Sequence, residues 1–537
     1  MPGAEHSRKE NMRQILLPLS LCLIAVTIVC PMNAQQIQVE EFVLENGMSF
    51  LLVPRRGDPN IAAGWIAKVG SANEYPGITG LSHLFEHMMF KGTKTIGTKN
   101  IAKDMEIILQ LDRVKGELIT EEERLIDRLR LGDISDLSSP ENRSPRHQEL
   151  LMEFGELLAV QEKLLVKNEF DRIYTRNGAS GMNAGTAHDF TVYFINVPAN
   201  KLELWCWLES DRLTNPVFRE FYSERNVVYE ERRLRTESTP TGRFREQFEA
   251  LFWSSHPYGW PVVGWPSDLE GITRSEANAY FEINYSPNNL VGSLVGDFDT
   301  TAAKKLIRKY FGRLERNPRA PSPVRTREIQ QLAEKRMIAY ADTNPEIALR
   351  YHTVADGHVD EAPLVVLTAL LTGRTGRLQK ALVEVQQVAN RTSAVQESRK
   401  WAGYFSVSGV AKQDRTPEEV GSAIRGELER LKGEPVGKRE LQKVKNRFSA
   451  DLFRRIESNF SLMVQLLIAE TYRGWETLNT DPARIQAVSA QDIKRVAKKY
   501  FRPENSAVAI YYRKESGEVI EGEITAGGSV ESSSPEE

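Results

Sequence analysis

The chain has 537 residues, 70 Lys and Arg against 73 Asp and Glu, and a formal net charge of −3. This length suits two to four domains of about 150 residues each. The content of 41% hydrophobic and 27% charged residues is typical of a globular protein and excludes a disordered or fibrous one. The nearly balanced net charge argues against a nucleic-acid-binding protein, which would have an excess of positive charge.

The first 34 residues have the pattern of an export signal. An apolar run over residues 15–29 is too short for a membrane span of about 20 residues. It follows three basic residues, Arg8, Lys9 and Arg13. We place the cleavage after Ala34, which predicts a mature chain in the periplasm or outside the cell. An uncleaved N-terminal anchor is the alternative.

The cysteine count agrees with this interpretation. Cys22 and Cys30 lie in the signal segment, so the mature chain would keep only Cys206. A single cysteine excludes an internal disulfide and a cysteine-based zinc site.

Strands are expected first, followed by helices. Residues 38–70 alternate apolar and polar side chains, which predicts strands, and a helix is expected from about Gly80. Residues 99–169 are strongly charged and carry apolar residues at helical spacing on both sides of turn-forming residues 132–140. This pattern predicts an inserted antiparallel helical hairpin, whose two apolar stripes need only each other to be buried.

A proline-rich stretch divides the rest of the chain. Residues 312–327 contain three prolines among polar residues and predict a linker between a first half, 35–311, and a second half, 328–512. From residue 513 to 537 the chain is rich in Glu, Gly and Ser, which predicts a disordered acidic tail.

An internal repeat links the two halves. Residues 272–296 align without a gap with residues 488–512, at an offset of 216. In both segments a predicted helix ends at Pro-x-Asn and an apolar strand follows. The match favours a duplicated domain.

The residues that carry chemistry lie in one short segment. His83 and His87 are four residues apart, so both imidazoles lie on one helix face and can reach the same ion. Glu86 points to the same side, where a carboxylate can take a proton from water activated by zinc. The flanking residues are mostly apolar, and ionisable groups on a buried helix need a partner or an ion.

The third ligand is expected to be acidic. Glu224 and Glu231 lie seven residues apart on one face of a predicted helix, where one can bind the metal while the other holds an imidazole. The other histidines of the mature chain are each isolated from this cluster: His147, His188, His256, His352 and His358.

These motifs resemble those of a known family. The segment Gly80-Leu-Ser-His-Leu-Phe-Glu-His-Met-Met-Phe-Lys-Gly-Thr93 is similar to the zinc-site signature of the pitrilysin/insulinase (M16) metallopeptidases. The second acidic helix resembles the family's other signature, which implies Glu231 as third ligand and Glu224 as its support. Asn183-Ala184-Gly185-Thr186 resembles the family's strand that lines the cleft, which implies that Asn183, Ala184 and Thr186 pair with the substrate backbone.

The resemblance covers about residues 40–512 and implies a fold. The implied fold is α+β, with two homologous halves, each an antiparallel sheet layered with helices, which would close like a clam shell around a chamber. Two halves in one chain are similar to the processing-peptidase-like branch of the family, here with the helical hairpin inserted.

Two departures from the family pattern stand out. The hairpin lengthens the gap between His87 and Glu231. In addition, the second half of active relatives offers an Arg and a Tyr to the substrate carbonyl, whereas the corresponding residues 384–391 contain no Tyr. Arg374 and Arg377 lie just upstream and are the available replacements.

The sequence therefore predicts a zinc endopeptidase of peptides or unfolded protein segments. It would hold one Zn²⁺ per chain, with Glu86 as the general base. Two alternatives stay open: an inactive or scaffold-type subunit, and a metal hydrolase of another substrate such as a cell-wall amide. Because the Arg–Tyr pair is missing, we also expect a dimer, either with a second copy or with a zinc-less relative.

Overall fold

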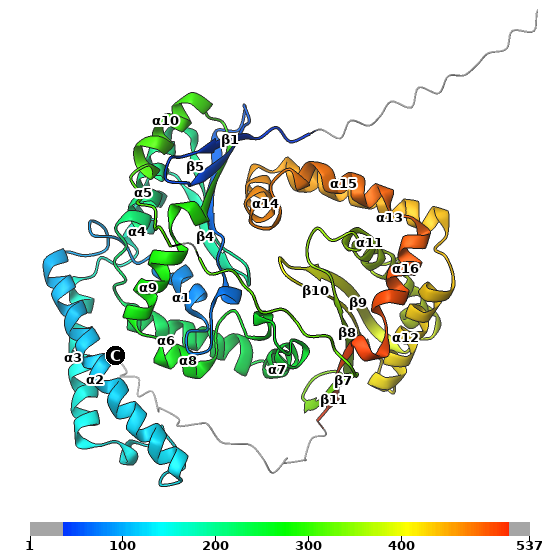
Figure 1. The fold of residues 1–537 in the computed structure, drawn as a ribbon, viewed down its shortest axis with the longest axis horizontal. Helices are drawn as coiled ribbons and strands as arrows, with labels where there is room; N and C mark the ends of the chain where they lie inside the picture. The colour runs from blue at the N-terminus through cyan, green and yellow to red at the C-terminus, as the bar shows by residue number, and fades with distance from the viewer. Residues whose placement is uncertain (1–35, 320, 515–537) are drawn as a thin grey trace, which may run out of the picture. The chain divides into compact units, whose positions relative to one another are not determined.

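Two β-sheets organise the computed structural model, which describes residues 36–319 and 321–514 (Figure 1). The first half contributes, in chain order, β1 (Glu40–Val43), β2 (Ser49–Pro54), β3 (Asn60–Ala67), α1 (Leu81–Met88), α2 (Ile101–Leu131), α3 (Pro145–Leu164), α4 (Glu169–Arg176), β4 (Ser180–Thr186), β5 (Thr191–Pro198), α5 (Leu202–Thr214), α6 (Phe221–Arg232), α7 (Gly242–Phe252), α8 (Pro266–Gly271), α9 (Arg274–Asn284), β6 (Leu290–Gly296) and α10 (Thr300–Phe311). The second half contributes β7 (Lys335–Ala341), β8 (Glu346–Thr353), α11 (Glu361–Leu371), β9 (Ala389–Ser398), β10 (Gly403–Ala411), α12 (Pro417–Gly433), α13 (Lys438–Glu457), α14 (Asn459–Tyr472), α15 (Thr477–Ala487), α16 (Ala490–Tyr500) and β11 (Ser506–Arg513). The predicted export signal lies outside the described residues, as does the predicted tail from residue 515 onward.

The two sheets share one topology. The strand orders are β1-β2-β6-β3-β5-β4 and β7-β11-β8-β10-β9, so that without β1 the strands match one for one. The predicted α+β fold of two homologous halves is confirmed, with one refinement. Neither sheet is wholly antiparallel, because β2 pairs with β6, and β7 with β11, in parallel. In each half the last strand returns beside the first strand of the shared topology, β2 or β7, after a long connection, and such a connection permits a parallel pair.

The repeat seen in the sequence recurs as matching local structure. Helices α9 and α16 begin and end 216 residues apart, and each leads through a Pro-x-Asn turn into the last strand of its half. The side-chain amide of Asn289 donates to the carbonyl of Asn284 at 2.8 Å. The amide of Asn505 donates to the carbonyl of Tyr500 at 2.9 Å, which is the same bond in the second half.

Each half also places one helix on the sheet of the other. Helix α14 packs on β3 and β6, and the rings of Phe460 and Phe194 lie 5.0 Å apart in an edge contact. Helix α7 packs on the second sheet, where the rings of Phe244 and Tyr511 lie 4.1 Å apart. This arrangement explains why β3 is buried along nearly its whole length, since the core of the first half covers one face and α14 covers the other.

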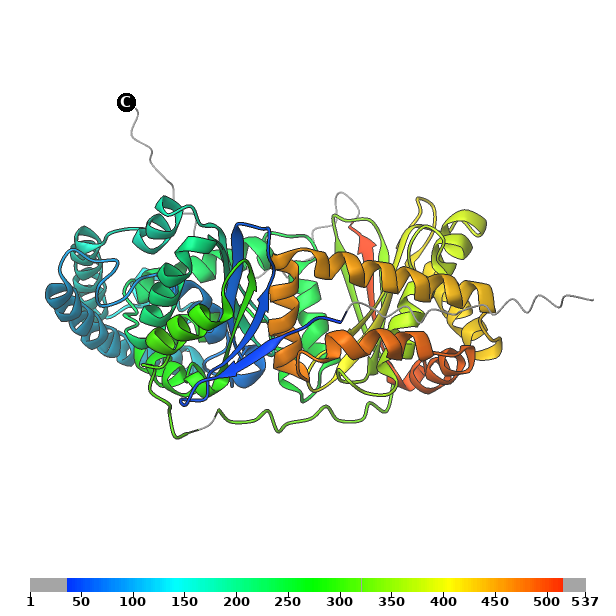
Figure 2. The same ribbon diagram turned by 90° about the horizontal axis from the view of Figure 1, so that it is seen from above.

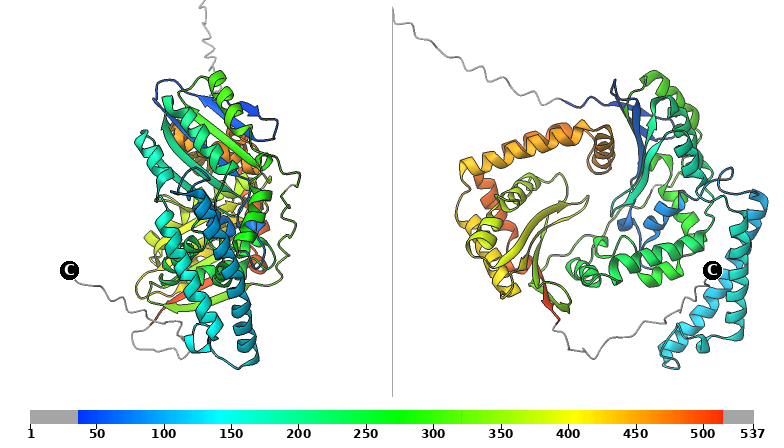
Figure 3. Two further views of the ribbon diagram at one scale, coloured as in Figure 1. Left: turned by 90° about the vertical axis from the view of Figure 1, so that its left-hand side faces the viewer. Right: turned by 180° about the vertical axis from the view of Figure 1, so that it is seen from behind.

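The predicted hairpin is present as α2 and α3, which lie side by side in the views of Figure 3. Its distal part behaves as expected, because Val114, Leu118 and Leu150 form a small cluster of their own. Its base differs from the prediction. The α2 carboxylate of Asp104 is fully buried and pairs at 2.8 Å with Arg219, which is also fully buried, so the base is built into the first half.

Between α10 and β7 the described residues 312–319 and 321–334 form no helix or strand, as the extended trace in Figure 2 shows, and the predicted linker, 312–327, lies within this stretch. Its end is anchored, because the carboxylate of Glu328 accepts hydrogen bonds from the backbone N–H groups of residues 254, 255 and 256. None of the described helices has the length and apolar character needed to cross a membrane.

Candidate metal site

Helix α1 carries the predicted motif, and its start is tightly determined. Gly80, the residue before the helix, has φ 91°, and a side chain there would meet the carbonyl oxygen of Val263 at 2.5 Å. The buried carboxylate of Glu74 accepts hydrogen bonds from the backbone N–H of Gly80 at 2.8 Å and of Ser82 at 2.6 Å. Burial outweighs these bonds and raises the pKa of Glu74 to about 8. The helix that presents the histidines is therefore held at its first turn.

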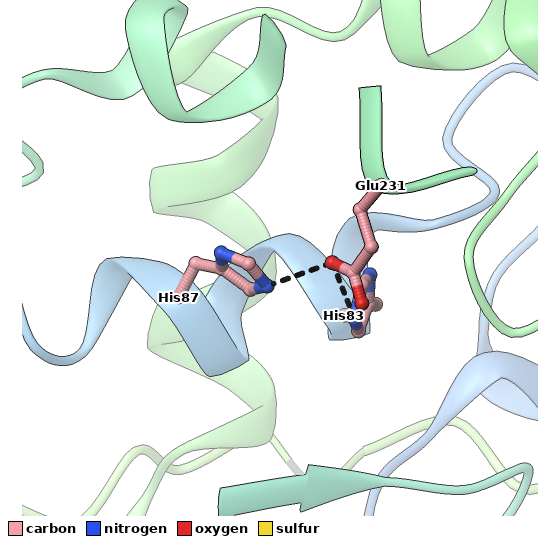
Figure 4. Close-up of side chains that lie close together, drawn as sticks. All are labelled: His83, His87 and Glu231. Carbon is pink, nitrogen blue, oxygen red and sulfur yellow. Dashed lines mark ion pairs between the residues drawn. The ribbon is translucent and has the colours of Figure 1, made fainter. Parts of the chain in front are cut away.

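His83, His87 and Glu231 converge at one point (Figure 4). One carboxylate oxygen of Glu231, Oε2, lies 3.6 Å from His83 Nε2 and 3.3 Å from His87 Nε2. Tetrahedral zinc with bonds of about 2.0–2.1 Å places its ligand atoms about 3.3–3.4 Å apart. The spacing and the two-imidazole, one-carboxylate donor set therefore both fit a zinc ion.

The electrostatic surroundings of the two histidines also suit a cation. His83 is 6% exposed, and burial lowers its pKa to about 3, assisted by the charges of His87 and Arg235, so the imidazole is neutral. Its Nδ1 is buried and has no hydrogen-bond partner among the described residues. Burial also lowers the pKa of His87, but Glu224 and then Glu231 outweigh it and the net shift is upward. This upward shift reflects the acidic surroundings that a cation would occupy.

Glu224 contacts the ring nitrogen of His87 that points away from Glu231. Its Oε2 lies 3.3 Å from His87 Nδ1, and its Oε1 pairs with the ammonium group of Lys91. Burial raises the pKa of Glu224, but the bonds to His87 and Lys91 prevail and lower it. A carboxylate on the far nitrogen of a histidine fixes the ring's tautomer and leaves the other nitrogen free for a metal.

Glu86 is oriented by a residue from a strand. The hydroxyl of Thr186, on β4, donates to Glu86 Oε2 at 2.7 Å. The sequence interpretation gave Thr186 a role toward substrate, and the structure adds this bond. Of the other residues of that strand, Asn183 is exposed and Ala184 is half-buried. Strand β4 is the last strand of its sheet, with β5 as its sheet partner.

Three supporting residues were not singled out from the sequence. Glu74 lies in an irregular stretch before the helix, where no pattern marks it. Lys91 stands inside the recognised motif, yet its contact with the α6 carboxylate depends on the fold. Arg235 pairs with Glu231 Oε1 at 2.7 Å, and its spacing of four residues on a helical segment was a signal that could have found it.

Of the two upstream arginines of the second half, Arg377 is engaged away from this cluster. Arg377 donates two hydrogen bonds of 2.8 Å to the carboxylate of Glu440, so its guanidinium is already engaged within its own half.

Comparison with known proteins identifies similar chains. A family model described as Insulinase (Peptidase family M16) matches residues 52–108, which include α1, and one described as Peptidase M16 inactive domain matches residues 271–448. A curated relative, the zinc protease PqqE of Helicobacter pylori, is 26% identical over 503 residues, covering 91% of this chain and 97% of the relative.

Solved structures share the fold. A protease from Helicobacter pylori superimposes with a TM-score of 0.72 at 23% identity, covering 89% of this chain and 99% of the other. The periplasmic protease PqqL from Escherichia coli gives a TM-score of 0.64 at 18% identity, covering 89% of this chain but 48% of that longer one.

Proposed function

Because this chain belongs to the M16 (pitrilysin/insulinase) family, we propose that it is a zinc-dependent endopeptidase that hydrolyses peptides or unfolded protein segments. The observation that carries the proposal is the convergence of His83, His87 and Glu231 beside Glu86. We assign the three converging residues as ligands of one Zn²⁺, Glu224 as the support of His87, and Glu86 as the catalytic base.

The chemistry divides between the metal and the protein. Zinc, when bound, supplies a Lewis acid that polarises the scissile carbonyl and makes water acidic enough to lose a proton near neutral pH. Glu86 takes that proton and returns it to the leaving amine nitrogen. The Thr186 hydroxyl holds Glu86 Oε2, which leaves Oε1 as the atom we assign to the proton.

An extended substrate segment suits the edge of β4. An edge strand has unpaired backbone groups on its outer side, and a peptide can add there as a further strand. We assign Asn183, Ala184 and Thr186 to this role, since the same strand contacts the catalytic base. Selection would then depend on the ability of a chain to extend more than on its exact sequence.

We also retain the predicted organisation and location as proposals. The first half, 35–311, would be catalytic and the second, 328–512, would not. The family model described as an inactive domain matches 271–448, which takes in residues 328–448 of the second half and also the end of the first half. The basic and apolar pattern of residues 1–34 favours the periplasm or secretion. The similar PqqL of Escherichia coli is described as periplasmic.

We propose a dimer because the second half lacks the expected Arg–Tyr pair that would donate to the substrate carbonyl. Arg377 is engaged by Glu440, and residues 384–391 contain no Tyr, so of the candidate donors in the second half the exposed Arg374 is left, and a second chain is the other source. Loss of one such donor costs about 10²–10³ in rate. Turnover per chain that falls on dilution below the dimer's dissociation constant supports this proposal, and constant turnover by a demonstrated monomer contradicts it.

The central test is Glu86→Gln in the purified mature chain. Zinc content by metal analysis should stay at one per chain, whereas hydrolysis of quenched fluorescent peptides should fall by about 10²–10⁴, because the base is lost and the ligands remain. Glu230→Gln is the matched control, since Glu230 is exposed beside Glu231 and pairs with Arg233. Full activity in Glu86→Gln would refute the mechanism.

The scaffold subunit is the second candidate, favoured by the family description of an inactive domain and by the engaged Arg377. A wild-type chain that binds zinc and peptide but cleaves no peptide, alone or with a co-expressed relative, would support the scaffold. Cleavage of peptides that is abolished by a chelator and restored by zinc would exclude it.

A further inference from the structure

The third candidate ligand has two carboxylate oxygens with different neighbours. Glu231 Oε2 faces the two imidazole nitrogens at 3.3 and 3.6 Å, and Glu231 Oε1 receives the guanidinium of Arg235 at 2.7 Å. Arg235 lies in a π-helical turn, Arg233–Glu237, that continues directly from α6. The same helical segment therefore supplies the carboxylate and the cation that engages its far oxygen.

We propose that Arg235 is the positioning residue for Glu231, holding the carboxylate so that one oxygen is presented to zinc. This inference rests on the proposed zinc site. Without a partner on Oε1, the carboxylate is free to rotate about its last bond and to offer either oxygen or both. A cation on Oε1 removes that freedom before the metal arrives. Outer partners of this kind typically change metal affinity by about 10–100-fold.

The neighbouring arginines pair with carboxylates other than Glu231. Arg232 pairs with Glu246 at the buried side of α6, and Arg233 pairs with the exposed Glu230 at 3.3 Å. Each arginine of this run thus engages a different carboxylate, and Arg235 is the one directed at the candidate ligand. The run also offers a matched control, because Arg233–Glu230 is an arginine–glutamate pair one step away from the site.

A simple stabilising role predicts a different result. The Arg235 side chain is 76% exposed, and ion pairs at such sites contribute little to folding. Removing it should therefore leave the thermal unfolding of the zinc-free chain unchanged. Its effect should appear in metal binding, which a surface ion pair away from the ligands would not alter.

The test measures zinc affinity by competition with a chromophoric chelator in the full mature chain. We expect Arg235→Ala to weaken zinc binding by about 10–100-fold. Arg235→Lys should recover part of the lost zinc affinity, because lysine restores the positive charge but not the planar geometry of the guanidinium group. Arg233→Ala should bind zinc as the wild type does. An affinity of Arg235→Ala within twofold of wild type would overturn the proposal, as would an equal loss in Arg233→Ala.

A double-mutant cycle shows whether Arg235 acts through Glu231. Once Glu231→Ala has removed the carboxylate, the added Arg235→Ala should weaken zinc binding no further, whereas an additional 10-fold loss would contradict the proposal. Peptide turnover is measured separately at saturating zinc. A wild-type chain without turnover, both alone and with a co-expressed relative, refutes the proposed peptidase, while the zinc affinities still decide the role of Arg235.

Discussion

Helices α1 and α11 occupy the same place in the two halves and differ in their chemistry. Each follows the second strand of the shared topology and precedes the strand pair at the sheet's end. Both bury leucines in the core of their half. Helix α1 adds two histidines and a glutamate on its remaining face, whereas the sequence of α11, Glu-Ala-Pro-Leu-Val-Val-Leu-Thr-Ala-Leu-Leu, has a single ionisable residue in its first turn. The fold thus requires the apolar positions, and the candidate metal ligands are an addition to one copy.

The starts of these helices differ as well. Helix α1 is preceded by the buried Glu74, whose bonds are to backbone N–H groups. Helix α11 begins after the buried Asp360, which accepts from Lys499 at 2.8 Å and from the hydroxyl of Tyr500 at 2.6 Å and pairs with Arg495. Burial raises the pKa of Glu74. Burial acts on Asp360 in the same direction, but its cationic partners prevail and lower its pKa.

The largest effect is expected where the insert enters the first half. Asp104→Ala leaves the fully buried Arg219 without its carboxylate, and breaking a buried ion pair costs about 3–5 kcal/mol. We expect the free energy of unfolding by urea to fall by that amount. Asp127→Ala, which removes an exposed pair with Arg130, should change it by less than about 0.5 kcal/mol. Equal effects in the two variants would show that the insert's base is not anchored by this pair.

The two buried carboxylates, Glu74 and Asp360, should affect the pH dependence of stability in opposite ways. The folded pKa of Glu74 lies above its unfolded value, so its contribution to stability is present below about pH 4.5 and is lost as pH rises through about 8. The wild type should therefore lose stability relative to Glu74→Gln between pH 5 and 8, by up to about 1.4 kcal/mol per pH unit. Urea unfolding of both zinc-free chains over this range measures the difference. A constant difference would show that Glu74 stays ionised.

Asp360 should behave in the reverse manner. Its folded pKa lies below the unfolded value, so its contribution is present above about pH 4 and is lost as pH falls further. Asp360→Asn should cost on the order of 1–3 kcal/mol at neutral pH, because charged hydrogen bonds are lost. The gap to wild type should narrow progressively in urea unfolding as pH falls below about 4, and part of it should remain at pH 3, because the folded pKa of Asp360 lies well below that pH. A gap that does not narrow between pH 5 and 3 would mean that packing, and not charge, is responsible.

The insert is the main difference in length between the halves. The smallest effect is expected from a change at its tip. Replacing residues 135–140, which are exposed or half-buried, with a Gly- and Asn-rich turn keeps the cluster of Val114, Leu118 and Leu150 as well as the buried Leu125 and Ile134. It should change the free energy of unfolding by less than about 1 kcal/mol, and zinc binding should match that of wild type. Loss of zinc would show that the tip shapes the site.

Sequence patterns revealed the features that depend on local spacing. The four-residue spacing of His83 and His87 predicted a shared helix face, and the structure places both imidazoles beside one carboxylate. The hairpin and the repeat were also visible, because they are patterns within continuous segments. The assignment of Glu231 needed the family resemblance, since a pair of acids seven residues apart is common on solvated helices.

Features that depend on tertiary contacts were not visible. The parallel strand pairs join segments more than 150 residues apart, and no local pattern encodes them. The buried Asp104 looked like one charge among many on a solvated helix until its partner Arg219 was placed against it. Thr186 was recognised as part of a strand, but its bond to Glu86 depends on how that strand lies against α1.

The placement of α7 and α14 on each other's sheets has a consequence for how the chain can be divided. Severed near residue 325, each fragment would expose an aromatic helix and the sheet face that the missing helix covers, as the contacts of Phe244 and Phe460 indicate. Such fragments would be insoluble alone and complementary when mixed. The duplication thus leaves two copies that depend on one another for solubility, so that a change confined to the second half can affect the half with the candidate metal site through helix α14, which packs on its sheet.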